Sequence, residues 1–355
     1  MIETSVESKK ILVTGGAGYV GSTFIRDALA ANYKIRCLDL LIYGGKSLKG
    51  YINHPNFEFI RGDIRDVALL ERALQDVDKV VHLAAIVGDK QCKAAPKSAV
   101  EINFVGTRIL AERAKRAGVK RFVFSSTCSN YGIVNPEKAA KEDDQLNPVS
   151  LYAETKIDCE RFLLGISDDQ FAVTCLRFGT AYGVSNRTRF DLLVNSFAYE
   201  AWTKKEIVAF AANTWRPYIH VADMSLLLKT ILEAPIEKIR GEIFNAGNNS
   251  GNFIKRDVVE MIKRIMPELK TTYVDSVDDR RDYRVNFDKL EQTVGFRLSK
   301  TVEQGIRELL NCFHIGLLTE TDYEDNKLDS LEKFFGDRES ELQENIMFNK
   351  NNRYV

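Results

Sequence analysis

The sequence TGGAGYVG at residues 14–21 constrains the fold more than any other stretch of this chain. It directly follows a short apolar run, Lys10–Thr14, and leads into a helical pattern over Ser22–Ala31. Glycines at this spacing permit a tight turn, a close approach of the backbone to a pyrophosphate, and close packing of the helix on the strand. The N-terminus of the helix then offers N–H groups and a positive dipole end to the phosphates. The residues expected at a dinucleotide pyrophosphate are Gly15, Gly18, Tyr19, Val20 and Gly21.

Short apolar runs alternate with helical patterns up to about residue 181. Near-continuous apolarity is typical of strands in a parallel sheet that is covered on both faces. The expected strands are Lys10–Thr14, Ile35–Asp39, Phe57–Arg61, Lys79–Leu83, Arg121–Ser125 and Val173–Phe178. The expected helices are Ser22–Ala31, Val67–Gln75, Ser98–Ala117 and Tyr152–Leu164. Because such alternation builds right-handed strand–helix–strand units, the sequence predicts an α/β fold of the Rossmann type, with a doubly wound parallel sheet.

The alternation weakens after residue 181, which predicts a smaller C-terminal α+β region. The expected strands here are Ile207–Phe210, Tyr218–Val221, Ile243–Asn245 and Thr271–Val274, and the expected helices are Phe190–Thr203, Asp223–Glu233, Asp257–Ile265 and Val302–Cys312. We therefore expect a dinucleotide-binding domain over 1–180, a mainly substrate-binding region over 181–318 and a charged tail over 319–355. The tail is either solvated or, through Leu328, Leu331, Phe334 and Phe335 at helical spacing, a cover or oligomer contact.

Composition and charge narrow the class of protein further. Fifty Lys and Arg balance fifty Asp and Glu over 355 residues, so the chain lacks the basic field that non-specific binding to nucleic acid or an anionic membrane requires. The six Cys are scattered without metal-ligand spacing and are typical of reduced thiols. The N-terminal residues do not resemble a signal peptide, and no apolar run is long enough to span a membrane. We expect a cytoplasmic protein without a structural metal.

Two acidic residues follow predicted strands on the dinucleotide side. Asp39 ends the second strand, 18 residues after Gly21 (39 − 21), close to the separation of about 20 at which a carboxylate accepts hydrogen bonds from the adenosine ribose. Such a carboxylate repels a 2′-phosphate and favours NAD over NADP. The alternative is that Asp39 only caps the following turn. Asp63 follows the third strand, where it either meets the adenine or caps its own loop.

A tyrosine and a lysine at positions 152 and 156 form the candidate catalytic pair. On a helix, residues four apart share one face, so the phenol and the ammonium point into the same cleft. A phenol with a pKa near 10 is a poor base at neutral pH, and a neighbouring cation lowers that pKa. The hydroxyl-rich strand end 125–129, SSTCS, lies where catalytic groups gather in open α/β sheets, beyond the carboxyl ends of the strands.

Together, these motifs resemble the extended short-chain dehydrogenase/reductases, specifically the nucleotide-sugar epimerase/dehydratase group that includes UDP-glucose 4-epimerase. The resemblance covers residues 10–310, and it rests on TGGAGYVGS, Asp39, GDIRD (62–66), HLAA (82–85), Asn103, SSTCSNYG (125–132), YAETK (152–156), RFGTAYG (177–183) and RPYIHVAD (216–223). It implies that Tyr152 is the general base, that Lys156 tunes it and holds the nicotinamide ribose, and that Thr127 relays the proton. It also implies a homodimer formed through two helices per subunit, Ser98–Ala117 and Tyr152–Leu164.

The resemblance assigns further residues to the two ligands. Around NAD it places Ile64, Leu83, Ala84, Ala85, Asn103 and Ser125, in addition to the glycine-rich turn, Asp39 and Asp63. Asn103 is either this contact or a helix cap. Around a nucleotide-diphosphate sugar it places Thr127, Cys128, Thr180, Arg189, Asn195, Arg216, Arg281 and Arg284. Of these, Arg216 and either Arg281 or Arg284 resemble diphosphate clamps, with salt bridges at a helix flank as the alternative for the last two.

The residue after the predicted relay separates the possible reactions. The 4,6-dehydratases have Asp-Glu after this threonine and the UDP-glucuronate decarboxylases keep a Glu, whereas this chain has Cys128-Ser129. Cys128 is expected to be a packed thiol rather than an acid–base group, and His82 and His220 are expected to pack or cap. The leading hypothesis is an NAD-dependent epimerase that oxidises C4 of a nucleotide sugar. The alternatives are a nucleotide-sugar 4-dehydrogenase or 4-ketoreductase with net hydride transfer, and a non-catalytic NAD-binding sensor.

Overall fold

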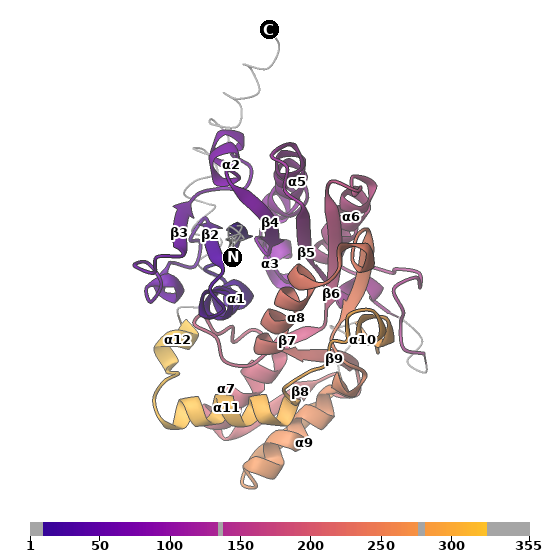
Figure 1. Cartoon of the computed structure of the whole chain (residues 1–355). Coiled ribbons are helices and arrows are strands. Elements are labelled where there is room, and N and C mark those ends of the chain that lie inside the picture. The colour runs from indigo at the N-terminus through magenta and orange to yellow at the C-terminus, as the bar shows by residue number, and fades with distance from the viewer. Residues whose placement is uncertain (1–9, 134–137, 276–280, 325–355) are drawn as a thin grey trace, which may run out of the picture.

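A seven-stranded parallel sheet forms the centre of the computed structural model, which describes residues 10–133, 138–275 and 281–324 (Figure 1). The strands follow the order β10-β6-β5-β4-β1-β2-β3, and every neighbouring pair is parallel. Their bounds are β1 (Lys10–Thr14), β2 (Lys34–Asp39), β3 (Phe57–Arg61), β4 (Val77–His82), β5 (Arg121–Thr127), β6 (Ala172–Phe178) and β10 (Glu242–Ala246). Strand order reverses between β1 and β4, which creates a ligand-binding crevice at their carboxyl ends. The predicted doubly wound sheet is confirmed.

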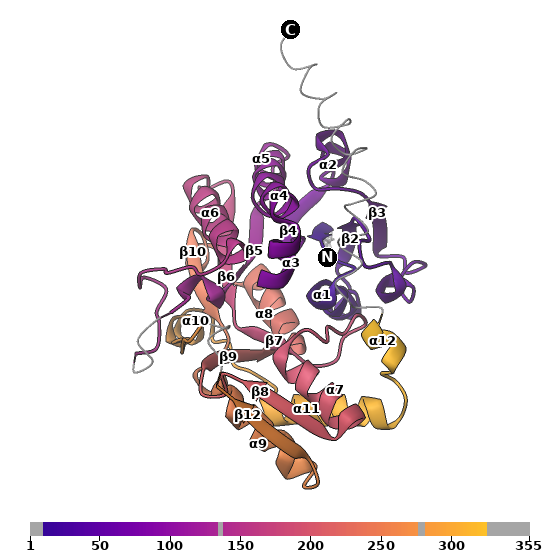
Figure 2. The same ribbon diagram turned by 180° about the vertical axis from the view of Figure 1, so that it is seen from behind.

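Helices cover both faces of this sheet. One face carries α1 (Tyr19–Ala30), α8 (Val221–Glu233) and α10 (Asp288–Val294). The other carries α2 (Val67–Ala73), α3 (Asp89–Ala94), α4 (Pro96–Val100), the π-helical turn η2 (Glu101–Gly106), α5 (Thr107–Arg116) and α6 (Leu151–Gly165). Helices α3 and α4 can be seen in Figure 2, which shows the molecule from the opposite side. In β1, Ile11 and Val13 pack toward α1 and α8, whereas Leu12 packs toward α2, α5 and α6. This two-sided burial explains the unbroken apolar runs.

A second lobe lies below the sheet in both ribbon views (Figure 1). It has a three-stranded sheet of β7 (Thr180–Tyr182), β9 (Trp215–His220) and β11 (Asn252–Ile254), and a pair formed by β8 (Glu206–Phe210) and β12 (Lys270–Val274). Its helices are α7 (Leu193–Lys204), α9 (Lys255–Ile265), α11 (Val302–His314) and α12 (Glu320–Glu324). Short 3₁₀ turns are η1 (Lys46–Leu48), η3 (Cys128–Tyr131), η4 (Ile236–Lys238) and η5 (Asn249–Gly251).

The chain returns to the main sheet after residue 180. Strand β10 pairs with β6, and α8 packs beside α1, where Ser225 Oγ donates to Asp27 Oδ2 at 2.7 Å. Residues beyond the expected boundary at 180 therefore complete the sheet and the helical layer on one of its faces. The strand and helix predicted at Ile243–Asn245 and Asp223–Glu233 exist, but they belong to this larger unit.

Two predicted helices differ from the observed ones. The helix expected over Ser98–Ala117 is interrupted by η2, where the wider π turn lets the side chain of Asn103 hydrogen-bond to both the N–H and the C=O of Ile86, at 2.8 and 3.0 Å. The helix expected from Phe190 begins only at Leu193, because the preceding residues form a loop that is hydrogen-bonded to the first lobe. The apolar positions expected between 328 and 335 lie outside the described residues.

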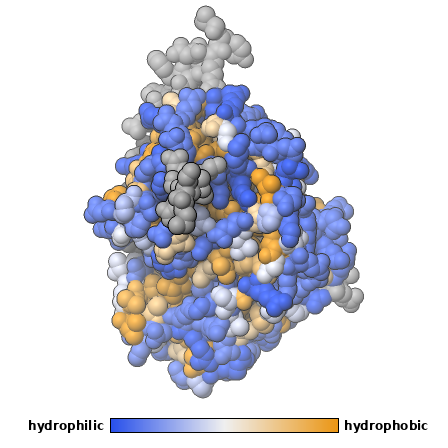
Figure 3. Space-filling model, in the orientation of Figure 1, coloured by the Kyte–Doolittle hydropathy of each residue, from blue (hydrophilic) through white to orange (hydrophobic). Residues whose placement is uncertain are grey.

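The face shown in Figure 3 is mostly hydrophilic, with an apolar patch at the lower left, where α11 leads into α12. Ile315 and Leu317, in the connection between these helices, are among the most exposed large apolar side chains. Within the described ranges, no helix combines the length and apolarity needed to cross a bilayer.

Candidate active site

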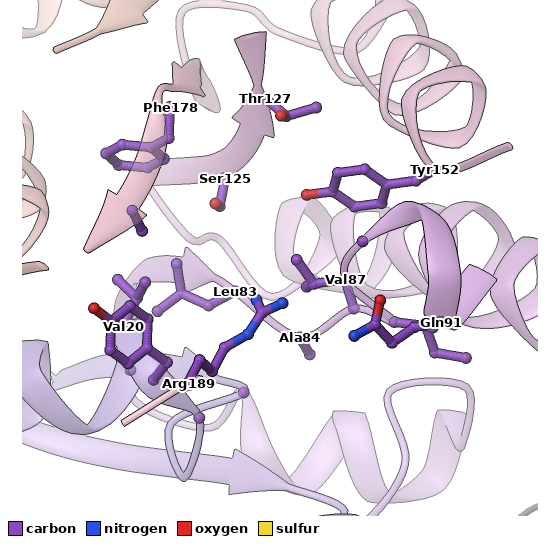
Figure 4. A pocket seen from close by; sticks show the side chains of 18 of the residues that line it. Val20, Leu83, Ala84, Val87, Gln91, Ser125, Thr127, Tyr152, Phe178 and Arg189 are labelled. Carbon is purple, nitrogen blue, oxygen red and sulfur yellow. The ribbon is translucent and has the colours of Figure 1, made fainter. Parts of the chain in front are cut away.

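One pocket lies at the carboxyl ends of the main-sheet strands and extends between the two lobes. Side chains from β5, α6, the glycine-rich turn and the loops after β2, β3, β4 and β6 face it (Figure 4). Eighteen predicted ligand-contacting residues line it: Gly15, Gly18, Tyr19, Val20, Gly21, Asp39, Asp63, Ile64, Leu83, Ala84, Ala85, Ser125, Thr127, Tyr152, Lys156, Thr180, Arg189 and Arg281. They come from residue 15 to residue 281, so only the tertiary structure brings them together.

The glycine-rich turn has the geometry that a dinucleotide requires. Gly15 has φ +74°, and a Cβ there would lie 2.6 Å from the backbone N of Ala84. A Cβ on Gly21 would lie 2.3 Å from the carbonyl oxygen of Gly15. Helix α1 starts directly after Gly18, with no side-chain cap and no acidic residue in its first turn. This end of the helix therefore presents backbone donors to a pyrophosphate, and the residues present fit NAD.

Asp39 lies at the end of β2 on the wall of this pocket. Its carboxylate accepts hydrogen bonds from the N–H groups of Ala17 and Leu41, at 2.9 and 2.8 Å. Burial raises its pKa, and these two hydrogen bonds and the charge of Arg187 act in the opposite direction. The carboxylate thus fixes the glycine-rich turn and caps the next loop, and its oxygens keep lone pairs for further donors. Asp63, in contrast, is ion-paired with Arg65 at 2.8 Å within its own loop.

The three predicted catalytic residues line the same pocket, from β5 and α6. Tyr152 lies in the first turn of α6 and extends its hydroxyl into the space that Ser125 on β5 also faces (Figure 4). Thr127 ends β5, and its hydroxyl oxygen accepts the N–H of Ser129 at 3.1 Å. Lys156 follows one turn after Tyr152 and donates from Nζ to the carbonyl oxygen of Ser125 at 2.7 Å. The spacing of four residues thus places both side chains on the pocket side of α6.

Burial controls the protonation of this group. It raises the pKa of Tyr152 well above its ordinary value, and the neighbouring Cys92 and Asp89 side chains add to that effect. The cation of Arg189 and a hydrogen bond with Thr127 lower the same pKa. Burial also lowers the pKa of Lys156. Nζ of Lys156 lies 5.9 Å from the centroid of the Tyr152 ring. That Lys156 tunes the phenol during the reaction stays a prediction.

Two ion pairs lie at the edge of the pocket near Tyr152. The sequence did not indicate either of them. Arg189 makes a bidentate contact with Asp191, at 3.0 Å from Nε and 2.6 Å from Nη2, and Gln91 donates to the same carboxylate at 3.0 Å. Asp89 pairs with Arg281 at 3.1 Å and accepts the hydroxyl of Ser150, the N-cap of α6, at 2.7 Å. The segment that carries Arg281 is thereby linked to the helix that carries Tyr152.

Five predicted contacts do not line the pocket: Asn103, Cys128, Asn195, Arg216 and Arg284. The Cys128 thiol is buried and donates to the carbonyl oxygen of Arg177 at 3.0 Å, which favours the expected packing role over the expected substrate contact. Asn195 accepts the N–H of Gly183 at 2.9 Å and donates to the carbonyl oxygen of Arg189 at 2.8 Å, so it shapes the loop between β7 and α7.

The three remaining residues, Asn103, Arg216 and Arg284, lie outside the pocket lining and contact other groups of the protein. Asn103 ties η2 to the loop after β4 through its two hydrogen bonds with Ile86. Arg216 is buried and donates to the carbonyl oxygens of Trp215 and Arg281, both at 2.6 Å. Arg284 lies against the ring of Trp215, 5.1 Å from its centroid. Between Arg281 and Arg284, the pocket position therefore belongs to Arg281.

Several lining residues were not predicted, chiefly Tyr43, Gly88, Asp89, Gln91, Phe178, Arg187, Asp191, Met224 and Tyr283. Gly88 and Asp89 could have been suspected, because they follow the fourth predicted strand at its carboxyl end. Arg187, Asp191 and Tyr283 come from irregular loops, where residue type and spacing carry no signal of position. Among the described residues, no cluster of His, Cys, Asp and Glu could hold a metal ion.

Comparisons with known proteins agree with this geometry. The chain is 28% identical to UDP-glucose 4-epimerase of Bacillus subtilis, over 71% of this chain and 80% of the relative. It is 27% identical to dTDP-glucose 4,6-dehydratase of Streptomyces niveus, over 86% and 92%. The structure of UDP-glucuronic acid 4-epimerase from Bacillus cereus, in complex with UDP-glucuronic acid and NAD, superposes with a TM-score of 0.78 at 25% identity, covering 87% of this chain and all of that one.

The family model for the NAD dependent epimerase/dehydratase family matches residues 11–247. This match spans the glycine-rich turn, Asp39 and the Thr127, Tyr152 and Lys156 group, which are the features assembled around the pocket. On this sequence match and this geometry, the chain belongs to the NAD-dependent epimerase/dehydratase family and is an enzyme of the extended short-chain dehydrogenase/reductase type.

Proposed function

We propose that this protein is a nucleotide-sugar epimerase that acts through a transient 4-keto sugar. The observation that carries the proposal is the meeting of Thr127, Tyr152 and Lys156 beside the glycine-rich turn, in a pocket where no carboxylate follows Thr127. The next side chain, Cys128, is buried away from the pocket, and Ser129 cannot supply the charge of a carboxylate. This arrangement provides for removal and return of hydrogen at one carbon, and it lacks the acid–base pair that the related dehydratases have after the threonine.

NAD, held by the glycine-rich turn, Asp39 and Lys156, would supply a reversible hydride acceptor beside the sugar carbon. Tyr152 removes the proton from the sugar hydroxyl, because its phenolic oxygen is the proton-accepting group that extends into the pocket. Thr127 bridges the substrate hydroxyl and the Tyr152 oxygen. Lys156 favours the phenolate form by its positive charge and is held in place by the carbonyl of Ser125. When the ketone is reduced, Tyr152 returns the proton.

The substrate extends from this centre toward the second lobe. Arg281 lines the pocket and presents a guanidinium suited to a diphosphate, whose charge would compete with Asp89 for it. Thr180 on β7 also lines the pocket. The complex of the Bacillus cereus relative with UDP-glucuronic acid supports a nucleotide-linked sugar as the substrate class.

A test of the reaction starts from purified protein without added cofactor. UDP-, dTDP-, GDP- and CDP-hexoses are incubated with it separately, and the sugars are identified by NMR. An epimerase interconverts two sugars and forms no stoichiometric reduced nicotinamide. Net formation of NADH and a 4-keto sugar would establish the 4-dehydrogenase alternative instead. Loss of water from the sugar would contradict the argument from the residues after Thr127.

The bound cofactor provides a second measurement. The protein is denatured and any released dinucleotide is identified by absorbance and mass. Stoichiometric NAD or NADH agrees with internal recycling of the hydride, whereas recovery of NADP would contradict the interpretation of Asp39.

We also propose a homodimer through the outer helices α5 and α6. Val100 and Val105 beside them are exposed large apolar side chains, and burial against a second copy would remove them from water. Light scattering coupled to gel filtration should give twice the mass of the 40.3 kDa chain, and Val105→Glu should reduce it. An unchanged dimer mass in this variant would exclude this surface.

A further inference from the structure

The loop before α7 joins the second lobe to the dinucleotide side of the pocket. We call residues 185–189 the strap. Ser185 Oγ donates to the carbonyl oxygen of Tyr19 at 2.7 Å, in the first turn of α1. Asn186 Nδ2 donates to the hydroxyl of Tyr51 at 2.8 Å, in the segment after β2. The strap is therefore fixed at the glycine-rich turn and at the loops that follow Asp39.

Arg187 lies at the middle of the strap and faces the dinucleotide side. Its guanidinium carbon is 3.8 Å from the centroid of the Tyr43 ring, so the cation lies over the face of that ring. Arg187, Tyr43 and Asp39 line the same pocket. Arg187 and Asp39 are near enough to influence each other's pKa, although no ion pair between them forms.

The guanidinium groups of Arg187 and Arg189 differ in how many of their N–H groups have hydrogen-bond partners. Arg189 donates twice to Asp191, whereas the Arg187 side chain makes no hydrogen bond with any residue that the structure describes. Burial lowers the pKa of Arg187 to about 10, which reflects the cost of removing this cation from water. Tyr43 recovers part of that cost through its ring face. Five planar N–H donors are left facing a pocket, and phosphate is the group that they fit best.

We propose that Arg187 binds a phosphate group of the dinucleotide, either the pyrophosphate or a 2′-phosphate on the adenosine ribose. Its position favours these groups because Tyr43 follows Asp39 by four residues, on the adenosine side, and the strap is anchored on the helix start where a pyrophosphate binds. The second lobe thereby contributes a direct contact to the cofactor. The strap retains the dinucleotide, and Arg187 opposes the discrimination that Asp39 exerts against NADP.

Binding measurements test this assignment independently of turnover. Calorimetric titrations of the full-length protein, freed of any bound dinucleotide, use NAD, NADP, ADP-ribose and adenosine. The variants are Arg187→Ala and Arg187→Lys, and Arg297→Ala serves as the control, because its side chain is 80% exposed. We expect Arg187→Ala to raise the Kd of at least one phosphate-containing ligand by about 10- to 100-fold, the range for a charged hydrogen-bonded contact. Arg187→Lys should recover part of the affinity.

The ligands separate the possible outcomes. Weakened NAD and ADP-ribose with unchanged adenosine assigns Arg187 to the pyrophosphate, and weakened NADP alone assigns it to a 2′-phosphate. Equal weakening of adenosine would show that Arg187 acts only by packing on Tyr43 and would overturn the proposal, as would unchanged binding of all four ligands. Thermal unfolding of each variant verifies that the fold is intact. Because no sugar nucleotide is present, the result is independent of the proposed epimerase activity.

Discussion

Single residues in the pocket carry separable roles, and Tyr152 is the clearest example. Tyr152→Phe keeps the ring in place and removes the oxygen that accepts the proton. We expect kcat to fall by roughly 10²- to 10⁴-fold, the usual contribution of a general base, while the Kd for NAD changes little. Turnover assays and calorimetry on the same preparation measure both quantities. Turnover like that of the unchanged protein would remove Tyr152 from the mechanism.

His82 predicts a pH dependence of stability. It is buried between the hydroxyls of Thr14 and Thr107, at 2.7 and 2.8 Å. Burial, with a smaller effect of Lys156, lowers its pKa to about 3. An unfolded chain binds this proton near pH 6.5, so the free energy of unfolding should fall as the pH decreases from about 6.5 toward 3, by at most about 1.4 kcal/mol per pH unit.

Urea unfolding at about pH 7 and about pH 5 measures this dependence. His82→Gln should show a shallower loss of stability than the unchanged protein. His314→Gln is the control, since His314 is exposed, and its loss should match that of the unchanged protein. Equal slopes for all three proteins would mean that His82 is not the titrating group.

At the scale of elements, a buried network aligns the strand and helix that hold the catalytic residues. Glu160, one turn beyond Lys156 on α6, is ion-paired with Arg177 on β6 at 2.8 Å, and both side chains are 3% exposed. The hydroxyl of Ser126, next to Thr127 on β5, donates to the same carboxylate at 2.5 Å. Asn130 of η3 donates to it at 3.0 Å. The position of Tyr152 relative to Thr127 thus depends on a charge pair outside the pocket.

Breaking the buried Glu160–Arg177 pair should lower the free energy of unfolding far more than breaking an ion pair at the surface. Glu160→Gln leaves the Arg177 cation buried without its partner, so we expect a loss of about 3–5 kcal/mol in the free energy of unfolding. Glu160→Leu combined with Arg177→Met should recover much of it, since no buried charge remains. Glu303→Gln, which breaks exposed pairs with Arg264 and Arg307, should cost at most about 1 kcal/mol. Similar losses in the two single variants would contradict this ranking.

At the scale of the whole molecule, the dinucleotide-binding half depends on later sequence. The face of the sheet that α1 covers is completed by α8, whose Leu227, Leu228 and Ile231 are fully buried in the same cluster as Phe24 of α1. Strand β10 covers the edge of β6. A chain ending at residue 180 would expose this apolar surface and an unpaired strand edge.

We therefore expect a fragment of residues 1–180 to aggregate or to lack fixed tertiary packing, whereas the full chain stays monodisperse. Near-ultraviolet circular dichroism and gel filtration compare the two. A second fragment, residues 1–247, retains α8 and β10 and should be the better folded of the pair. A folded 1–180 fragment that binds NAD would show instead that the predicted boundary at residue 180 marks an independent domain.

Features that depend on neighbouring residues in the sequence were predicted well, and features that depend on contacts between distant segments were missed. The bounds of β1, β3 and α2 and the core of α6 were close to those observed, because continuous apolarity and helical periodicity are local properties. The π turn at Asn103 was missed, since it depends on hydrogen bonds to Ile86 on another segment. The pairs Arg189–Asp191 and Asp89–Arg281 were missed for the same reason.

By itself, the sequence determined the doubly wound sheet, the dinucleotide turn and the placing of Tyr152 and Lys156 on one face of a helix. These features follow from apolar runs and from residue spacing, both of which are local properties of the chain. Only the tertiary structure decided that Arg216 turns away from the pocket, that Arg281 rather than Arg284 lines it, and that Arg187 reaches Tyr43. These side-chain positions depend on how segments that are distant in the sequence pack together. Residue type alone does not indicate which neighbour a side chain will contact.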